Sequence, residues 1–407
     1  MSSITNKIIA KISVIAAKVM RFFAYSIPVI FALATLGCIL PTLPILGSVG
    51  PLLVSPYGPW ISILSLLCAI VVIRRWRESG KRRLLILTAL ASFAAVGTAA
   101  IQIQQFSVAQ QNGVNIDVLR TLWLGEEMHD SAAAIIQTYT SYEGQDLPLA
   151  IYSPANRSAN SAAPVLVYVH GGGWGGGTLH DRASDMRWFA DQGYLVISVE
   201  YSLSTADRHT WDIAERQVAC GLVWIADNAE RFGGDGARLA LFGESAGGNL
   251  VLNISYRANA GLLNPVCEGA LPQIAAVIAG YPIIDALQMY QNNDVIAGHF
   301  ARMMTTRYTG GTPAEYPGRY AAISSGTHIN ALAPPTLLLP GLADHLLPPK
   351  PVYDFAKKAR AAGVDARVIA FPYGEHSYDQ RIGSIGSQLV RGATLRFLGE
   401  FGLAPSK

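Results

Sequence analysis

The sequence predicts an α/β protein in which a mostly parallel, doubly wound sheet follows about three transmembrane helices. Two observations predict this arrangement. Long uncharged apolar stretches occupy the first quarter of the 407-residue chain, and after them short apolar runs alternate with amphipathic stretches. Stretches of the first kind suit membrane spans, and strand–helix alternation implies a parallel sheet with helices on both faces.

The charges of the chain are distributed unevenly. Lys and Arg number 31 against 28 Asp and Glu, a formal net charge of +3, and charged residues make up only 14% of the chain. Soluble domains contain about 25% charged residues. Disordered chains and nucleic-acid-binding chains need a high charge density, so the low charged fraction excludes these two classes. Residues 1–21 and 74–83 carry +4 and +5, whereas residues 107–407 carry −6.

We expect three spans within the first 106 residues, near Phe22–Leu46, Leu52–Ile73 and Leu84–Phe106. No charged residue occurs in 22–73 or 84–106, and about 20 apolar residues cross a bilayer. Glycines and prolines predict a loop at 47–59, and Pro41 and Pro44 should end or kink the first span. Buried helices of a soluble core are the alternative, although such helices rarely lack charge on every face.

The basic flanks predict the orientation of these spans. Lys- and Arg-rich flanks stay in the cytoplasm, so the N-terminus and the 74–83 loop should lie there together, as two intervening spans require. Everything after residue 107 should then be periplasmic or otherwise outside, in an integral protein of a bacterial inner or plasma membrane. A cleaved signal peptide fits less well, because no small-residue cleavage site follows a single short apolar region. The predicted units are an anchor (1–106), a linker (107–130) and a domain (131–407).

Four cysteines divide into two pairs. Cys38 and Cys68 lie within expected spans. Cys220 and Cys267 lie in the part expected outside the cytoplasm, where a disulfide is chemically permitted. We slightly favour two buried free thiols and leave the pairing open.

Strands and helices should alternate through the domain. Strands are expected at Ala133–Thr140, Leu147–Tyr152 (after a turn at Glu143–Gly144), Val165–Val169, Tyr194–Val199, Leu239–Phe242, Ile274–Ala279, Thr336–Leu339 and Ala366–Phe371. Helices are expected at Arg182–Gln192, Ala214–Arg231, Gly247–Ala260, Pro351–Ala362 and Leu389–Phe401.

One short motif marks a candidate nucleophile. Residues 243–247 read G-E-S-A-G, which matches G-x-S-x-G between an expected strand and an expected helix. This context is what a nucleophile elbow requires, because the tight turn exposes the serine at a helix start, where the dipole favours developing negative charge. Ser245 is therefore the candidate nucleophile, and a plain glycine-rich turn is the alternative.

A serine nucleophile needs a base, and the base needs an orienting carboxylate. His376 follows an expected strand and is the candidate base, and Asp344, just past another strand, is the candidate acid. This gives the chain order Ser, acid, His. Asp285 is a weaker candidate acid, and His345 adjoins Asp344 and could not point at both Asp344 and the serine. Asp344 as a turn former and His376 as a surface residue are the plainer interpretations.

A glycine-rich stretch, HGGGW at 170–174, follows the expected strand Val165–Val169. Backbone N–H groups aimed at a tetrahedral oxyanion stabilise it, and we expect Gly172, Gly173 and Ala246 to donate them. His170 should orient the loop rather than act as a base. The residues expected to support the two motifs are His170, Gly171, Trp174 and Glu244.

The same stretch also fits a different class of protein. Gly171, Gly173 and Gly176 spell G-x-G-x-x-G, and Glu200 ends the next expected strand, as in dinucleotide-binding proteins. That interpretation leaves Ser245 without a role and places a cytoplasmic cofactor outside. We expect no cofactor, and because no C-x-x-C pair, H-E-x-x-H or Asp-rich loop occurs, no metal.

Together, HGGGW, GESAGG (243–248), GLAD (341–344) and GEHS (374–377) resemble the hormone-sensitive-lipase-like and feruloyl-esterase-like carboxylesterases of the α/β-hydrolase fold, over roughly residues 130–400. The resemblance implies a serine carboxylesterase with a Ser–His–Asp triad, an acyl-enzyme and a small-molecule ester substrate. Two positions depart from the family: Ser202 replaces the usual arginine of Tyr-Arg-Leu, and Gln217 replaces an acid. The family's N-terminal cap is not evident.

Several functions share these residues. An acyltransferase or deacetylase acting on envelope glycans and a serine peptidase would use the same triad, and a catalytically inactive hydrolase-like binding module is the non-enzyme alternative. We expect the membrane and a small ester as partners, and no nucleic acid. The acyl and alcohol preference, the cap and the oligomeric state stay open.

Overall fold

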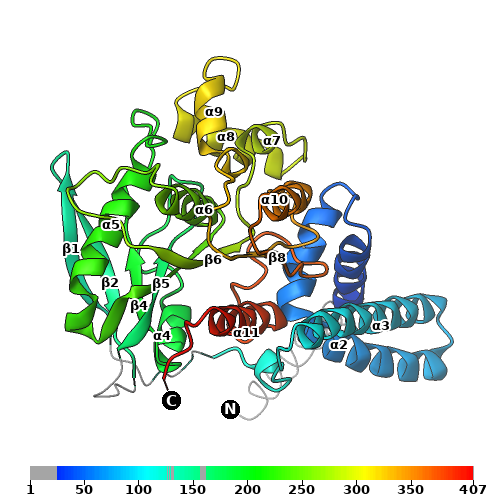
Figure 1. Ribbon diagram of the computed structural model, residues 1–407. Helices are drawn as coiled ribbons and strands as arrows, with labels where there is room; N and C mark the ends of the chain where they lie inside the picture. The colour runs from blue at the N-terminus through cyan, green and yellow to red at the C-terminus, as the bar shows by residue number, and fades with distance from the viewer. Residues whose placement is uncertain (1–24, 126, 128, 130–132, 156–161, 407) are drawn as a thin grey trace, which may run out of the picture.

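The computed structural model describes residues 25–125, 127, 129, 133–155 and 162–406. An eight-stranded sheet in the order β1-β2-β4-β3-β5-β6-β7-β8 forms its centre (Figure 1). The strands are β1 (Ile135–Tyr142), β2 (Gln145–Tyr152), β3 (Ala163–Val169), β4 (Leu195–Val199), β5 (Gly234–Glu244), β6 (Ile274–Gly280), β7 (Thr336–Leu339) and β8 (Ala366–Val368). β2 pairs antiparallel with β1 and β4, and all the other pairs are parallel.

Helices cover both faces of this sheet, as the sequence predicts. They are α4 (Ala183–Asp191), α5 (Ala214–Asn228), α6 (Ala246–Asn259), α10 (Lys350–Ala361) and α11 (Ile385–Glu400). One core joins α5, α6 and α10 to the sheet, and a second core joins α4 and α11 to the other face. The central strands are buried on both faces, which is why β3 reads as a continuous apolar run.

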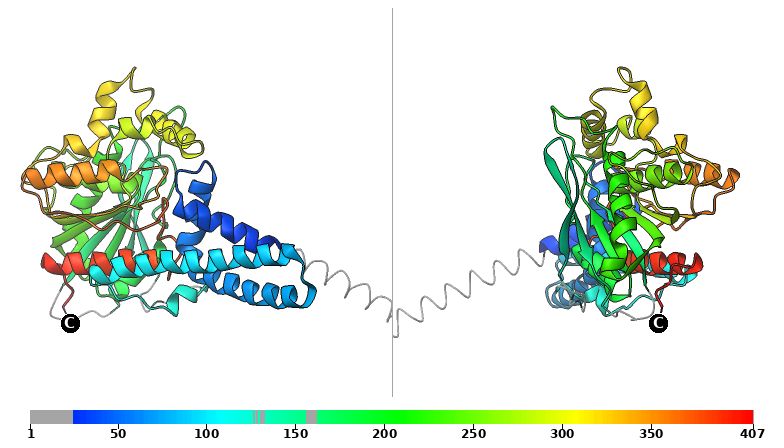
Figure 2. Two further views of the ribbon diagram at one scale, coloured as in Figure 1. Left: turned by 90° about the vertical axis from the view of Figure 1, so that its right-hand side faces the viewer. Right: turned by 60° about the vertical axis from the view of Figure 1, so that its left-hand side comes forward.

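Three short helices that the sequence analysis did not predict lie between β6 and β7, above the carboxyl end of the sheet (Figures 1 and 2). They are α7 (Ala286–Tyr290), α8 (Ala297–Thr309) and α9 (Pro317–Ile323). Residues typical of helix starts could have predicted these helices from the sequence. Asp285 accepts the Gln288 N–H at the start of α7, Asp294 accepts the Ala297 N–H at the start of α8, and Pro317 opens α9.

The N-terminal segment forms a helical bundle that projects from one side of the sheet domain (Figure 2). It contains the helix Tyr25–Ile39, α2 (Leu46–Ser79) and α3 (Arg82–Gln111). Of the described residues, α2 and α3 are long and apolar enough to cross a membrane, and Tyr25–Ile39 is shorter. The first three residues of the first expected span, 22–24, lie outside the described residues. The basic residues of 1–21 also lie outside them. After α3, the short 3-10 helix η1 (Arg120–Leu122) lies within the expected linker.

The predicted loop at 47–59 is wrong, because α2 continues through it with Pro51, Pro56 and Pro59 inside the helix. The glycines there permit close helix packing instead of turns. A side-chain carbon at Gly50 would lie 2.5 Å from the Ala34 carbonyl oxygen, and one at Gly58 would lie 2.0 Å from the amide of Gln102. Small residues of this kind let neighbouring helices approach each other.

Cys220 of α5 and Cys267, which precedes β6, form a disulfide. The slight preference for two free thiols was therefore wrong. The spacing of 47 residues carries no pairing information, whereas packing of the loop before β6 against α5 brings the two Cα atoms to 5.6 Å. Cys38 and Cys68 are free.

Candidate active site

Ser245 lies in the turn between β5 and α6. Its backbone φ of 55° is in the left-handed region, which residues other than glycine rarely adopt. The neighbouring glycines permit this turn to sit against β3, since a side-chain carbon at Gly247 would lie 2.1 Å from the Val169 carbonyl oxygen. The G-x-S-x-G spacing thus reflects close packing of an elbow, and it presents the hydroxyl at the start of α6.

Two further side chains meet this serine at the carboxyl edge of the sheet. The Nε2 atom of His376 lies 3.1 Å from the Ser245 Oγ, and its Nδ1 atom lies 2.8 Å from Asp344 Oδ2. The second oxygen of Asp344 accepts the Leu347 N–H at 2.7 Å, which holds the carboxylate in place. Asp285, the competing acid, instead caps α7. The residues that the sequence analysis selected from three separate loops therefore form one hydrogen-bonded chain.

The charge of Asp344 affects the titration of His376. Burial acts to lower the pKa of this imidazole, but the charge and hydrogen bond of Asp344 outweigh burial, and the pKa lies above its usual value of 6.5. Asp344 therefore stabilises the imidazolium that forms when His376 takes a proton. The Nδ1 contact also keeps Nε2 directed at the serine.

The loop after β3 lies directly against the serine. A side-chain carbon at Gly171 would lie 3.3 Å from the Ser245 Cβ. Gly172 and Gly173, both with positive φ, line the same cavity as Ser245 and His376. Ala246 is the first residue of α6, where the N–H has no acceptor within the helix.

The flanking residues of this loop hold it in shape. The ring of His170 is fully buried, contacts Glu200 Oε1 at 2.9 Å and the Gly171 carbonyl at 2.9 Å, and stacks on Tyr201. Trp174 is buried against Tyr308 of α8 with ring centroids 4.2 Å apart. Glu200, which the dinucleotide interpretation needed for a ribose, is therefore engaged by His170.

The two departures from the family pattern contact each other. Gln217 accepts the N–H of Ser202 at 2.9 Å and donates its own amide to the Ser202 hydroxyl at 2.9 Å. A neutral pair thus lies at the two positions where the resemblance implies an arginine and an acid. Each departure could be noted from the sequence, but their contact was visible only in the fold.

A buried ionic cluster that the sequence analysis missed underlies the site. Arg182 contacts Asp379 at 2.7 Å and Glu244 at 3.4 Å, and Asp379 also accepts the Tyr281 hydroxyl at 3.0 Å. Burial raises the pKa of Glu244 to about 8; Arg182 lowers it, and the nearby carboxylates raise it. Glu244, next to the nucleophile, is therefore largely neutral at pH 7.

The helical bundle contacts the loop that carries His376. His345 bridges the two: its Nε2 lies 2.8 Å from the Pro41 carbonyl and its Nδ1 lies 2.5 Å from Glu375. The hydrogen bond to Glu375 raises the pKa of His345, partial burial lowers it, and the Pro41 carbonyl raises it again. The net result is a pKa of about 9. His345 is thus charged at neutral pH and unable to serve as a base.

Three more contacts join the bundle to this loop. Gln105 donates to the Pro372 carbonyl at 3.0 Å, Tyr373 donates to Gln104 at 3.2 Å, and Arg381 donates to the Pro56 carbonyl at 2.6 Å. The sequence contained no signal for these contacts, because they join residues more than 260 positions apart.

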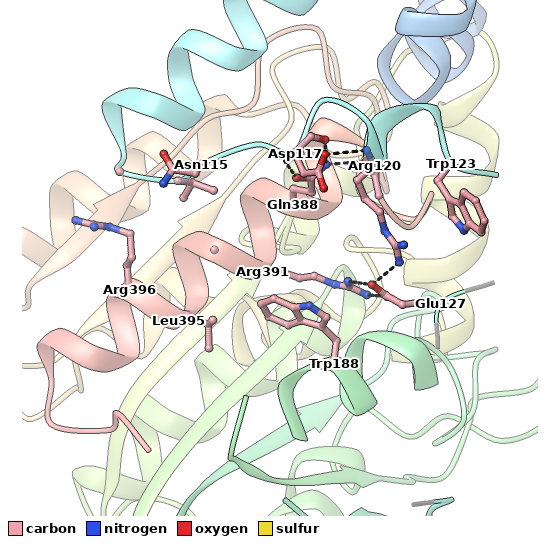
Figure 3. A pocket seen from close by; sticks show the side chains of 14 residues that line it. Asn115, Asp117, Arg120, Trp123, Glu127, Trp188, Gln388, Arg391, Leu395 and Arg396 are labelled. Atoms are coloured by element: carbon pink, nitrogen blue, oxygen red, sulfur yellow. Dashed lines mark hydrogen bonds and ion pairs between the residues drawn. The ribbon is translucent and has the colours of Figure 1, made fainter. Parts of the chain in front are cut away.

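The candidate site opens into a cavity of about 450 Å³, whose walls include Met304 of α8, Leu346 and Gln380. A larger cavity of about 760 Å³ lies between the linker and α11 (Figure 3). Its central charged groups satisfy one another: Arg391 and Arg120 both contact Glu127, at 2.8 and 2.7 Å. These ion pairs join the linker to the domain, and the residues that line the cavity include no Ser–His pair.

The sheet, elbow and helices define an α/β-hydrolase-type protein, and known proteins agree. Residues 149–359, just over half of the chain, match the BD-FAE family model. Esterase LipQ of Mycobacterium tuberculosis is 28% identical over 264 residues, covering 63% of this chain and 60% of that protein. Probable carboxylic ester hydrolase LipM of the same organism is 26% identical over 265 residues, covering 65% and 60%.

Solved structures show the same fold. Esterase Est2 of Thermogutta terrifontis, bound to propionate, is 22% identical with a TM-score of 0.55, and the match covers 68% of this chain and 97% of that one. The chain belongs to the BD-FAE family. It spans about 60% of the length of LipQ and LipM, and the names of these relatives agree with the prediction of a carboxylesterase-like serine hydrolase.

Proposed function

We propose that this protein is a serine carboxylic-ester hydrolase. Ser245 attacks the ester carbonyl while His376 takes its proton, and the alcohol leaves with that proton as the acyl-enzyme forms. His376 then activates water, which releases the acid and restores the serine. Asp344 orients the imidazole, and the N–H groups of Gly172 and Gly173, with that of Ala246, bind the oxyanion.

The observation that carries this proposal is the chain of contacts from Ser245 through His376 to Asp344, at 3.1 and 2.8 Å. Nucleophile, base and orienting group are each within hydrogen-bond reach of the next, which is the geometric requirement for an activated serine. The esterase names of the relatives support the same reaction.

The test is turnover of a short p-nitrophenyl ester together with labelling by a fluorophosphonate. We expect Ser245→Ala to abolish both, and Ser141→Ala, an exposed hydroxyl on β1, to leave both unchanged. Turnover by the Ser245→Ala protein would remove the assignment. Product analysis with a sugar or peptide substrate present separates hydrolysis from acyl transfer and from peptidase activity. An unlabelled serine in folded protein would instead indicate an inactive binding module.

The proposal includes an integral membrane anchor of three spans, with the N-terminus in the cytoplasm and the catalytic domain outside. Positively charged flanks support it, and so does the position of Arg83 over the Tyr25 ring, 5.8 Å away, at the end of the bundle where the 74–83 loop lies. The Cys220–Cys267 disulfide suits an oxidising compartment. A reporter fused after residue 107 should be active outside the cytoplasm, and cytoplasmic activity would contradict the topology.

A further inference from the structure

The position of the bilayer along the helical bundle follows from charge and length. Arg74 and Arg83 mark the charged end of α2 and α3. A hydrocarbon core of about 30 Å takes about 20 helical residues at 1.5 Å each. Counted from those arginines, the core extends to Val54 in α2 and to Ile103 in α3. Both helices continue beyond it, α2 back to Leu46 and α3 on to Gln111.

The far border of that core coincides with the contacts made by the catalytic loop. Tyr373 packs against the buried cluster that contains Val54 and Ile101. Gln104 and Pro56, which hydrogen-bond to Tyr373 and Arg381, lie within two residues of the border. The loop that carries His376 therefore rests on the outer end of the spans.

The reacting atoms lie near this outer end of the spans. His376 lies three positions after Tyr373, a backbone reach of at most about 11 Å. His376 Nε2 is 3.1 Å from the Ser245 hydroxyl. Allowing for the length of the imidazole side chain, the nucleophile is at most about 20 Å from Tyr373. The headgroup layer extends roughly 5–8 Å beyond the core, so an ester in that layer would have to rise by at most about 12–15 Å to reach the serine.

Apolar surface surrounds this level of the molecule. Leu40 and Ile45 flank the turn whose Pro41 carbonyl contacts His345, and they are 45% and 57% exposed. Leu342, one residue before the turn to Asp344, is 44% exposed. Leu346 lines both the catalytic cavity and a neighbouring cavity of about 260 Å³ whose walls are mostly apolar. Such a patch next to a site suits contact with lipid.

We propose that the substrate is an acyl ester of an amphiphile held in the outer leaflet of the anchoring membrane, with its ester group at headgroup level. This inference rests on the proposed ester hydrolysis and the proposed membrane anchor, and it adds the substrate class. The spans hold the serine within about 20 Å of the outer border of the core, so a long acyl chain can stay partly in the bilayer while the ester group reaches the site. Hydrolysis releases a fatty acid and leaves the alcohol part in the bilayer.

The first test measures depth. The full-length protein is placed in phosphatidylethanolamine–phosphatidylglycerol vesicles, Ser245 is labelled with a dye-bearing fluorophosphonate, and nitroxide quenchers are attached to lipid headgroups or dissolved in water. We expect the lipid-bound quencher to reduce the fluorescence at least threefold more than the soluble one. Quenching by the soluble reagent alone would overturn the inference, whereas failure to label Ser245 would count against ester hydrolysis itself.

The second test compares two butyrate esters of one fluorogenic alcohol, one free in water and one tethered to a phospholipid. We expect Ile45→Ser together with Leu40→Ser to slow the tethered ester at least fivefold and to leave the free ester within twofold. Leu262→Ser is the matched control, because Leu262 is 66% exposed beyond the end of α6, at the opposite edge of the sheet. If the double variant hydrolyses the tethered and the free ester as fast as the wild type does, the proposed substrate class is overturned. If in that case Ser245→Ala alone loses turnover of both esters, the hydrolase assignment still stands.

Discussion

Removing the His345 side chain should loosen the contact between the helical bundle and the catalytic loop. His345 bonds Glu375 at 2.5 Å and the Pro41 carbonyl at 2.8 Å. A hydrogen bond to a charged group contributes about 1.5–3 kcal/mol, but the histidine is only partly buried, and solvent screening reduces this figure. His345→Ala should therefore lower the free energy of local opening by about 2 kcal/mol, which is roughly a 30-fold change in the opening equilibrium.

Hydrogen exchange measures this opening directly. The Ala343 N–H, which donates to the Gly374 carbonyl at 2.9 Å, should exchange about 30-fold faster in His345→Ala than in the wild type. The control is His328→Ala, because the ring of His328 hydrogen-bonds to the Ala322 carbonyl at an exposed position. A change below threefold in the His345→Ala protein would refute the idea that this bridge holds the loop.

The same bridge should respond to pH. The folded pKa of His345 is raised to about 9 from an ordinary value of 6.5. Its contribution to stability is therefore complete below pH 6.5 and is lost as the pH rises through 9. The difference in Tm between wild type and His345→Ala should shrink over that interval, and a difference that stays constant to pH 10 would contradict the assigned charge.

Four further outcomes are expected. Asp344→Asn should reduce kcat by roughly 1,000- to 10,000-fold, because the imidazole loses its orienting partner, and a loss below tenfold would count against Asp344. Since the raised pKa of His376 requires activity to fall as pH drops through a value above 6.5, the acid limb of kcat/KM should lie there; a limb below pH 6 would contradict this. Glu244→Gln should keep kcat at pH 7 within roughly threefold, because burial already holds that carboxyl neutral, and a large loss would show that its charge is required. Stability rather than activity should change in Cys220→Ser/Cys267→Ser, by up to about 4 kcal/mol for a 47-residue separation; an unchanged thermal unfolding temperature would refute it.

Local chemistry determined most of what could be predicted. Continuous apolar runs such as Val165–Val169 predicted buried parallel strands, because a strand covered on both faces has no polar side. The elbow at Ser245 and the glycines after β3 were also recognisable, because the close approach of backbone segments needs the absence of a side chain. These features depend on residues that are adjacent in the sequence, and so the sequence alone can predict them.

Other features depend on which distant segments meet, and only the tertiary structure decided them. Glycines near Gly50 suggested a loop, but packing against Ala34 makes them part of a helix. Cys220 and Cys267 carried no pairing information until α5 met the loop before β6.

The partner of His345 was decided in the same way. His345 adjoins Asp344 in sequence, yet its ring turns to Glu375 and to a carbonyl 304 residues earlier. The sequence by itself determined an apolar N-terminal segment and a domain with hydrolase motifs. The fold alone decided that the end of the first meets the catalytic loop of the second, because hydrogen bonds and packing between remote residues have no periodic signature in the chain.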